Sequence, residues 1–302
     1  MVWALTVDVA VLAREGAAWT VLLVRSADPP QEGRWALPGG TVDPDEPTLD
    51  AACRELAEET GVVLGPEDLV LLGCYTDPGR DPRGRYASLL HLAVLPEPAQ
   101  VRAASNGAEA RWWPLRAGDG GVANDALAVD HAVLLRDVRR VAPHTSTPRV
   151  RRVVERDVPE VIRLHHAALW AAGAHAGPGG WDDDLEDVEA AYVQAGGEFL
   201  VATLGPVVVG MGALRPVDVV TAEVKRMRVL PRWQGRGVGR AVARALEDRA
   251  VDLGFRRLVL DTTEQQRAAV ALYASLGFVR TGSTVVAGMP AVLFEKDLAP
   301  GP

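Results

Sequence analysis

Three glutamates near residue 57 are spaced so that their carboxylates can act together. Glu55, Glu58 and Glu59 occupy positions i, i+3 and i+4 of a stretch that the sequence predicts to be helical, so they share one helical face. Like charges on one face repel each other, and a hard divalent cation that prefers oxygen ligands removes this repulsion. A bare acidic run is more often a solvated helix face, so the choice between these interpretations depends on the surrounding residues.

The residues around the glutamates complete a fixed pattern. Gly39 and Gly40 allow a tight turn that leaves a backbone carbonyl near the helix, and Arg54 can pair with Glu58 four residues later. The run GTVDPDEPTLDAACRELAEETGV resembles the Nudix box at every fixed position. Those positions are Gly40, Glu46, Arg54, Glu55, Leu56, Glu58, Glu59, Gly61 and Val62. The preceding run WALPGG resembles the approach to the box, and the resemblance covers about residues 1 to 141.

The Nudix resemblance implies hydrolysis of a nucleoside diphosphate linked to a second group X. It assigns the Gly40 backbone and the three glutamates to Mg²⁺ or Mn²⁺, with Glu58 and Glu59 also catalytic and Arg54 orienting a catalytic glutamate. Such a metal bridges pyrophosphate oxygens, neutralises developing charge and acidifies a bound water for attack on phosphorus.

A loop with three arginines is the candidate substrate-binding segment. Arg80, Arg83 and Arg85 lie in a proline-rich loop that resembles a segment of the ADP-ribose pyrophosphatase branch of the family. Their guanidinium groups could hold phosphate or ribose oxygens, although a solvated hairpin loop explains the residues equally well. Glu109 stands where related enzymes often supply another acidic catalytic residue, and it could also be an ordinary surface glutamate.

A second chemical pattern lies near residue 235. The run EVKRMRVLPRWQGRGVGR, from Glu223 to Arg240, predicts a strand, a glycine turn and a helix that begins near Val238. Glycines at such a turn let backbone N–H groups at the helix N-terminus hold a pyrophosphate, while an ordinary strand-to-helix turn needs no ligand. The dinucleotide fingerprint GxGxxG is not met at positions 235–240.

The second pattern resembles the acetyl-CoA signature of the GNAT acetyltransferases. Gln234, Gly237 and Gly239 match it, the order of predicted elements matches the fold, and the run ALYASLGF up to Phe278 resembles another familiar stretch of that superfamily. The resemblance spans about residues 149 to 298. It implies that the diphosphate of acetyl-CoA lies on the turn formed by Gln234, Gly235, Arg236, Gly237, Val238, Gly239 and Arg240.

The GNAT resemblance also implies roles for four other residues. The backbone of Met227 and Val229 would pair with the pantetheine arm like an added strand. Tyr273 is the candidate general acid for the departing thiolate, and Glu223 the candidate base for the amine, directly or through water. Without these roles Tyr273 would be a core tyrosine.

Other polar residues in the second half allow weaker interpretations. The acidic residues from Asp182 to Asp187 could attract a cationic amine, but a solvated helix start that complements the helix dipole is the simpler interpretation. His165 and His166 are neighbours on a predicted helix and so point in different directions, which disfavours joint metal binding.

The predicted elements give an α/β protein of two domains, each a mixed sheet flanked by helices. The domains are a Nudix α/β/α sandwich at residues 1–141 and a GNAT fold at residues 150–302, joined by a linker at 142–149. The first domain has predicted strands at Val2–Leu12, Thr20–Arg25, Leu69–Tyr75, Tyr86–Leu95 and Ala110–Pro114, and helices at Pro47–Thr60 and Asn124–Val141. The second has strands at Arg149–Val154, Glu198–Thr203, Val207–Leu214, Glu223–Leu230 and Arg257–Thr262 followed by two more, and helices at Asp157–Ala172, Trp181–Ala195, Val238–Leu253 and Gln265–Leu276.

The composition of this 302-residue chain excludes some classes of binding partner. A formal net charge of −8 argues against nucleic acid as the main partner. No apolar run reaches about 18 residues, and the start lacks the basic region of a signal peptide, so we expect no membrane and a cytoplasmic location. We expect a bifunctional enzyme whose partners are a nucleotide, acetyl-CoA and an amine, with a homodimer left open. The alternative is a regulatory protein that senses nucleotide or acetyl-CoA, in which one domain binds without turnover.

Overall fold

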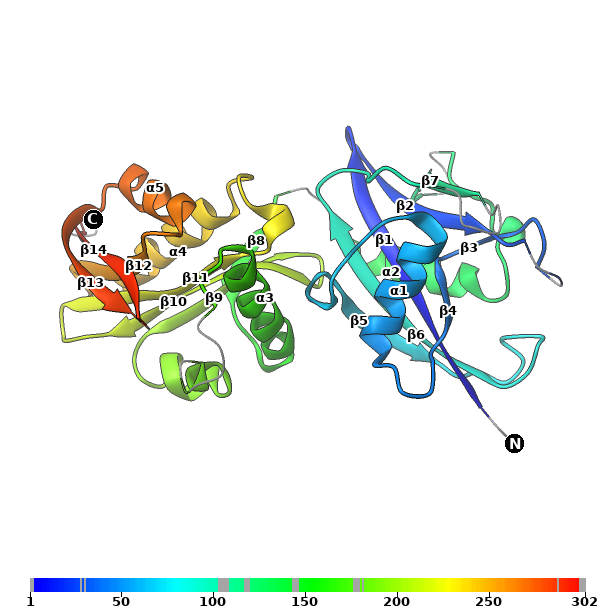
Figure 1. The fold of residues 1–302 in the computed structure, drawn as a ribbon, viewed down its shortest axis with the longest axis horizontal. Coiled ribbons are helices and arrows are strands. Elements are labelled where there is room, and N and C mark those ends of the chain that lie inside the picture. The colour runs from blue at the N-terminus through cyan, green and yellow to red at the C-terminus, as the bar shows by residue number, and fades with distance from the viewer. Residues whose placement is uncertain are drawn as a thin grey trace. The chain divides into compact units, whose positions relative to one another are not determined.

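The computed structural model describes two compact units of the α/β class. It describes residues 3–27, 29, 31–102, 109–116, 120–142, 147–175, 180, 182–286 and 288–298. The first unit consists mainly of Met1–Ser146, and the second mainly of the chain from Thr147 onward. Each unit has its own mixed sheet flanked by helices, as the sequence predicts (Figure 1). Half of the predicted linker, residues 143–146, lies outside the described residues.

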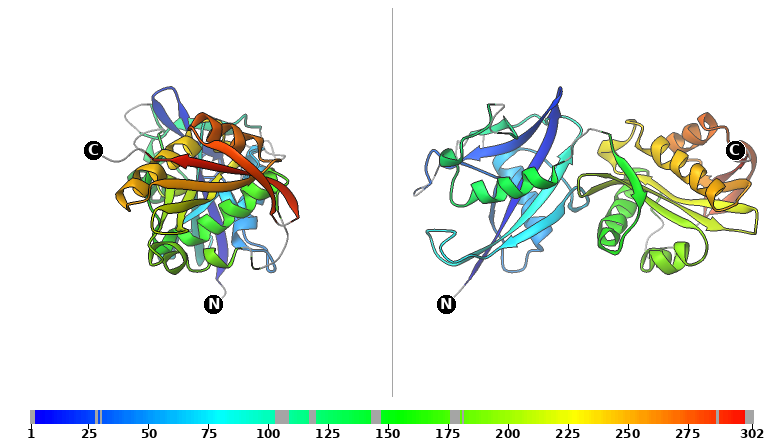
Figure 2. Two further views of the ribbon diagram at one scale, coloured as in Figure 1. Left: turned by 90° about the vertical axis from the view of Figure 1, so that its left-hand side faces the viewer. Right: turned by 180° about the vertical axis from the view of Figure 1, so that it is seen from behind.

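The first unit is a sheet between two helices. Its strand order is β3-β2-β1-β6-β5, with β4 paired to β1 and β7 to β2. The bounds are β1 Ala4–Glu15, β2 Ala18–Arg25, β3 Trp35–Ala36, β4 Gly39–Thr41, β5 Val70–Tyr75, β6 Tyr86–Leu95, β7 Ala110–Pro114, α1 Thr48–Thr60 and α2 His131–Val141. Helix α1 covers one face of the sheet and α2 the other (Figures 1 and 2). This is the α/β/α sandwich that the sequence predicts.

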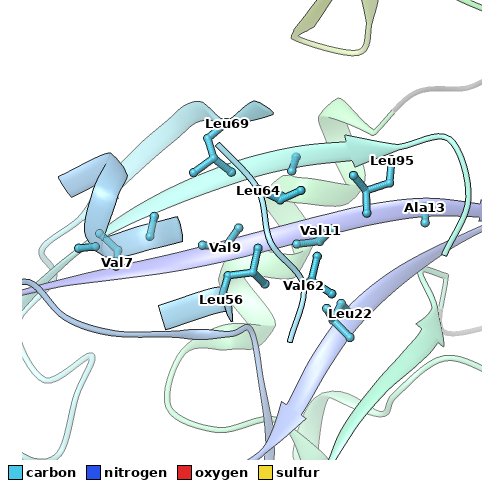
Figure 3. Close-up of a cluster of buried hydrophobic side chains, with 13 residues drawn as sticks. Val7, Val9, Val11, Ala13, Leu22, Leu56, Val62, Leu64, Leu69 and Leu95 are labelled. Atoms are coloured by element: carbon cyan, nitrogen blue, oxygen red, sulfur yellow. The ribbon is translucent and has the colours of Figure 1, made fainter. Parts of the chain in front are cut away.

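Strand β1 is the centre of this unit and is buried from Thr6 to Ala13. Its odd-numbered residues from Val7 to Ala13 pack with Leu56 of α1 in one apolar cluster (Figure 3). One edge of β1 pairs in parallel with β6, and the other edge is shared between β2 and β4. The shared edge places Gly39 and Gly40 in the middle of the sheet, beside α1.

The two helices of the first unit agree with their predicted bounds to different degrees. Helix α1 ends where predicted, because Gly61 adopts a left-handed conformation with φ of 72° and its N–H bonds to the carbonyl of Ala57. The predicted helix from Asn124 is wrong in its first part. The chain there makes only a short 3₁₀ turn, and the N–H of Ala128 pairs with the carbonyl of Trp35 instead of a helical partner.

The second unit is a seven-stranded sheet in the order β13-β14-β12-β11-β10-β9-β8. The strands are β8 Arg149–Arg152, β9 Glu198–Leu204, β10 Val207–Pro216, β11 Thr221–Val229, β12 Arg257–Thr263, β13 Val279–Val286 and β14 Met289–Asp297. The helices are α3 Val158–Ala171, α4 Val238–Asp252 and α5 Arg267–Ser275. The predicted order of strands and helices is confirmed except in the acidic segment. There the described residues form a 3₁₀ turn at Asp183–Leu185 and a π-helical turn at Glu189–Val193 in place of one helix, and Trp181 lies outside them.

Strands β11 and β12 separate part-way along their length. Their parallel pairing ends at Glu223 opposite Val259, although both strands continue for several residues. The register between β10 and β11 also shifts, and Arg226 has a positive φ of 54° in the shifted segment. The bulge and the separation open the sheet beside residues 226–229.

Candidate functional sites

Arg54 fixes the carboxylates at the start of the first site. Its guanidinium donates to both carboxylate oxygens of Glu46, at 2.8 and 2.7 Å, and to Glu55 at 2.8 Å. The predicted pair with Glu58 is present but longer, at 3.6 Å. Arg54 therefore orients Glu55 more firmly than Glu58, whose side chain is 61% exposed.

Two glycines let the carboxylates approach the backbone. A Cβ atom on Gly40 would lie 2.4 Å from the Glu55 carboxylate, and one on Gly39 would lie 2.1 Å from the carbonyl oxygen of Val7. The N–H of Gly39 donates to Oε2 of Glu59 at 3.0 Å. The turn therefore needs glycine at both positions, because any side chain there would displace either a glutamate or strand β1.

The position of Glu59 favours binding of a divalent cation. Burial raises the pKa of Glu59 to about 7, the Gly39 N–H opposes this rise, and the charges of Glu55, Asp8 and Glu58 add to it. Among the described residues the ligand oxygens of the three box glutamates do not all lie within 4.8 Å of one another. The exposed Glu58 has room to turn toward the other two. A mutually repelling set of carboxylate oxygen donors suits Mg²⁺ or Mn²⁺.

A cavity of about 280 Å³ opens beside Glu59 and the glycine turn. Its wall includes Asp8 and His131, which sequence reasoning missed. Nδ1 of His131 accepts the N–H of Leu37 at 2.9 Å, so Nε2 carries the proton and lies 3.7 Å from Asp8. The hydroxyl of Ser88 donates to the other Asp8 oxygen. The only sequence signal for this arrangement was a polar residue that interrupts the apolar run of β1.

The predicted substrate arginines divide into two groups. Arg80 and Arg83 line the cavity, where Arg80 makes two 2.8 Å bonds to Asp130. Arg83 is held by Asp81 at 2.7 Å. Arg85 is not among the cavity residues, since its guanidinium stacks 4.1 Å from the ring centre of Trp3. Of the three candidate arginines, Arg80 and Arg83 thus share this cavity and Arg85 does not line it.

Glu109 also lies off the wall of this cavity. Its side chain is 52% exposed and its nearest ion-pair contact is Arg25 at 3.9 Å. The surface interpretation of Glu109 therefore fits its position better than a catalytic one.

The second unit contains a cavity of about 590 Å³ between the end of β11 and helices α3, α4 and α5. Of the residues predicted to bind acetyl-CoA, those on its wall are Met227, Val229, Gln234, Gly235, Gly237, Gly239 and Arg240. Gly235 and Gly237 have φ of 71° and 84°, which glycine adopts without strain. Gly237 caps α4, so the helix N-terminus opens on this cavity.

Two predicted acetyl-CoA residues are not on this wall. Val238 is 1% exposed, and a Cβ on Gly210 would lie 2.7 Å from it, so Val238 is a core residue packed against β10. The Arg236 side chain is also absent from the wall. A spacing motif cannot distinguish the turn residues that face a ligand from those that face the core.

Tyr273 and Glu223, the predicted acid and base, lie in different places. Tyr273 is 4% exposed, and burial raises the pKa of its hydroxyl group, which therefore stays protonated. It lines both this cavity and a neighbouring one. Glu223 lines neither, because it lies where β11 and β12 are still paired, and it is bound by Arg215 at 2.7 Å. The role of Glu223 as a base, directly or through water, therefore stays a prediction.

The neighbouring cavity, the β11–β12 cavity, has a volume of about 250 Å³ and is lined by residues of β11, β12 and α3. The two cavities share Met227, Arg228, Gln266, Ala269 and Tyr273. Their junction is thus the place where groups bound in the two cavities would meet.

Two carboxylates of the acidic segment, those of Asp182 and Asp184, are already paired with an arginine. Arg226 binds Asp182 at 2.9 Å and makes two bonds to Asp184. His165 donates from Nε2 to Asp182 at 2.9 Å, and burial, followed by the Arg228 charge, lowers its pKa to about 4. Asp182 and Asp184 therefore hold an arginine. Asp183, Glu186 and Asp187 are exposed, as the solvated interpretation expects.

The two adjacent histidines approach each other more closely than helix geometry predicted. Nitrogens of His165 and His166 and an oxygen of Asp182 all lie within 4.8 Å of one another. The Arg226 guanidinium, 3.3 Å from His165, already supplies the positive charge at this cluster. A second cation there would meet its repulsion.

Comparison with known families matches one family to each half of the chain. The NUDIX domain family matches residues 3–138, and the Acetyltransferase (GNAT) family matches residues 166–278. The protein thus combines a hydrolase domain with an acetyltransferase domain, and both are enzyme domains. The chain belongs to the GNAT acetyltransferase family and carries a NUDIX domain in its first half.

Individual relatives cover different parts of the chain. It is 33% identical over 120 residues to the ADP-ribose pyrophosphatase of Methanocaldococcus jannaschii, which covers 40% of this chain and 66% of that protein. It is 30% identical over 146 residues to the uncharacterized N-acetyltransferase YjgM of Escherichia coli, covering 47% of this chain and 86% of that protein. A MutT/nudix family protein structure from Enterococcus faecalis is 30% identical, covering 47% of this chain and 62% of that one, with a TM-score of 0.41. None of the described helices could span a membrane.

Proposed function

We propose that the first unit hydrolyses a nucleoside diphosphate linked to a second group, with ADP-ribose as the favoured substrate. The observation that carries this proposal is the buried Glu59 carboxylate, held on the Gly39 N–H beside Glu55. Likeness to an archaeal ADP-ribose pyrophosphatase supports the substrate. The cavity arginines Arg80 and Arg83 could recognise phosphate or ribose oxygens.

Different residues of the first unit would bind the metal and position its ligands. Glu55, Glu58 and Glu59, with the Gly40 carbonyl, would hold Mg²⁺ or Mn²⁺. Such a metal neutralises pyrophosphate charge and acidifies water. Arg54 keeps Glu55 in place through its bonds to the carboxylates.

A hydrolysis screen tests this first activity. The full chain is assayed with ADP-ribose, other ADP-sugars and further nucleoside diphosphate derivatives, with and without Mg²⁺. We expect Mg²⁺-dependent turnover that falls at least about 100-fold in Glu58→Gln and Glu59→Gln. Activity that survives both substitutions would exclude the metal site. Tight nucleotide binding without turnover across the panel would instead favour a sensing domain.

We propose that the second unit transfers an acetyl group from acetyl-CoA to an amine. The observation that carries this proposal is the 590 Å³ cavity that extends from the N-terminus of α4 to Tyr273, beside the opened end of β11. The turn at Gln234–Arg240 would hold the diphosphate, and the β11 backbone at Met227 and Val229 would pair with the pantetheine arm.

The chemistry of the transfer needs one proton donor at the junction of the cavities. The amine nitrogen attacks the acetyl carbon, the C–N bond forms and the C–S bond breaks. Tyr273, buried and protonated, gives its hydroxyl proton to the leaving sulfur. Calorimetric titration with acetyl-CoA tests the cofactor directly. We expect binding that weakens when Gly237→Val fills the turn, and absence of binding would refute this proposal.

A further inference from the structure

Two charged residues that line the β11–β12 cavity form no ion pair within the described part of the chain. Among the described residues, neither the Arg228 guanidinium nor the Asp261 carboxylate has an oppositely charged group within 4.0 Å. Arg228 donates from Nη1 to the carbonyl of Met227, and its Nε is buried without any hydrogen-bond partner. Both residues line the 250 Å³ cavity.

The other charges around this cavity are balanced within the protein. Lys225 lies 3.5 Å from Glu223, and Arg226 is bound by Asp182. His165, bonded to Asp182, is neutral near neutral pH because burial and the two arginines disfavour its charged form. Arg228 and Asp261 are therefore the charges left for a ligand.

The two unpaired charges lie on the two strands that separate. Arg228 is on β11 and Asp261 on β12, both beyond the last paired residues, Glu223 and Val259. A buried, uncompensated charge is costly, so such groups are normally paired. One opposite charge from a ligand could satisfy Arg228 and another could satisfy Asp261.

We propose that the acetyl acceptor is a small zwitterion, an α-amino acid or a close relative. Its carboxylate binds Arg228 and its ammonium group faces Asp261. This inference rests on the proposed acetyl transfer and names its substrate class. The cavity volume of about 250 Å³ suits a ligand of that size better than a peptide segment or a large amine.

The arrangement also accounts for the protons of the reaction. The ammonium group gives one proton to Asp261 and from there to solvent, which leaves a neutral amine. When nitrogen attacks the acetyl carbon and the C–S bond breaks, Tyr273 protonates the sulfur. The second proton lost by nitrogen restores the Tyr273 hydroxyl. The products are an N-acetyl amino acid, CoA and one proton.

The test compares acceptors that differ only in the carboxylate. The twenty common α-amino acids are assayed beside their decarboxylated amines, such as leucine with isopentylamine, at saturating acetyl-CoA, by following CoA release. We expect wild-type kcat/KM for at least one amino acid to exceed that for its amine by about 100-fold. In Arg228→Met this preference falls by about 10- to 100-fold, mainly through KM for the amino acid.

Matched variants separate recognition from structural damage. Arg257→Met removes an exposed arginine of β12 outside both cavities and should leave the preference unchanged. Arg228→Met should melt no lower than wild type, because it removes an uncompensated buried charge. Added amino acid should raise the melting temperature of the wild type and not of Arg228→Met. Asp261→Asn should lower kcat for the amino acid, with the loss greatest at low pH, where the amine stays charged.

Several outcomes would overturn the inference while leaving acetyl transfer intact. One is acetyl-CoA binding with equal use of amines that lack a carboxylate, or with no amino acid used at all. A second such outcome is that Arg228→Met lowers kcat equally for the amino acid and for its amine. Arg228 would then act on the thioester of acetyl-CoA and not on the acceptor carboxylate. Failure of acetyl-CoA to bind in the calorimeter would instead refute the proposed function itself.

Discussion

Replacing Glu59 by glutamine tests whether the ionised carboxylate of Glu59 lowers the free energy of unfolding of the first unit. Glu59 accepts the Gly39 N–H and is surrounded by the charges of Glu55, Asp8 and Glu58. Glutamine keeps the shape and the oxygen acceptor but removes the charge. In the presence of a chelator we therefore expect Glu59→Gln to be more stable than wild type at alkaline pH.

The pH dependence follows from the raised pKa of Glu59. Its ordinary value is 4.5 and its folded value about 7, so folding disfavours the ionised form. Below about pH 4.5 the carboxyl is protonated in both states and imposes no penalty. The penalty grows between pH 4.5 and 7 and is complete above 7. The difference corresponds to about 3 kcal/mol, and partial solvent access reduces this to about 2 kcal/mol.

Hydrogen exchange measures this effect within the first unit of the full chain. Exchange of peptides from β1 and α1, followed with denaturant in a chelator, gives the free energy of unfolding at pH 4.5 and pH 8. We expect Glu59→Gln to match wild type at pH 4.5 and exceed it by about 2 kcal/mol at pH 8. Glu58→Gln, at an exposed position of the same helix, should change stability by less than about 0.5 kcal/mol.

Adding Mg²⁺ should make wild type more stable than Glu59→Gln at alkaline pH. A cation that binds only the folded state adds about 2.7 kcal/mol at one hundred times its Kd. Wild type should gain this stabilisation and Glu59→Gln should lose most of it. In the chelator experiment, Glu59→Gln could exceed wild type in free energy of unfolding by the same amount at pH 4.5 and pH 8, or Glu58→Gln could show the same increase. Either result would refute the reasoning that burial and neighbouring charges destabilise the ionised Glu59.

Three further substitutions follow from specific contacts. Gly40→Ala should push the Glu55 carboxylate off Arg54, because the new Cβ would lie 2.4 Å from it, and lower hydrolysis at least about 10-fold without changing acetyl transfer. Arg226→Met should destabilise the second unit by about 3 kcal/mol in denaturant unfolding, because it leaves the two paired aspartates uncompensated; a change below about 1 kcal/mol would contradict this. Tyr273→Phe should keep its packing and its melting temperature but lower kcat for acetyl transfer about 100-fold, and an unchanged kcat would exclude it as the acid.

Much of the fold was predictable because local rules fix it. Helical spacing placed Glu55, Glu58 and Glu59 together, and Gly61 ended α1 in the left-handed conformation that glycine favours. The glycine turn before α4 was predictable for the same reason, since Gly235 and Gly237 both need positive φ. These features depend on residues within a few positions of one another, so spacing alone describes them.

The remaining parts of the sites depend on contacts between distant residues. Asp8 and His131 meet across the first sheet although 123 positions separate them, and no motif connects them. Glu223 carries the right chemistry for a base, but it lies in the paired part of β11 and β12 and is bound by Arg215, so it does not line the cavity. The acidic segment near Asp184 avoids a continuous helix, because Arg226 from β11 binds its carboxylates. Pairing partners of this kind are set by tertiary structure.

A crossed activity assay tests most directly the claim that one chain carries two separate active sites. Hydrolysis of ADP-ribose with Mg²⁺ and acetyl transfer from acetyl-CoA are both measured on full-length wild type, Glu59→Gln and Tyr273→Phe. We expect Glu59→Gln to lose at least about 100-fold in hydrolysis and Tyr273→Phe about 100-fold in acetyl transfer. Each variant should keep the other activity within about twofold. Loss of both activities in either variant, or a wild type that performs only one reaction, would contradict the claim.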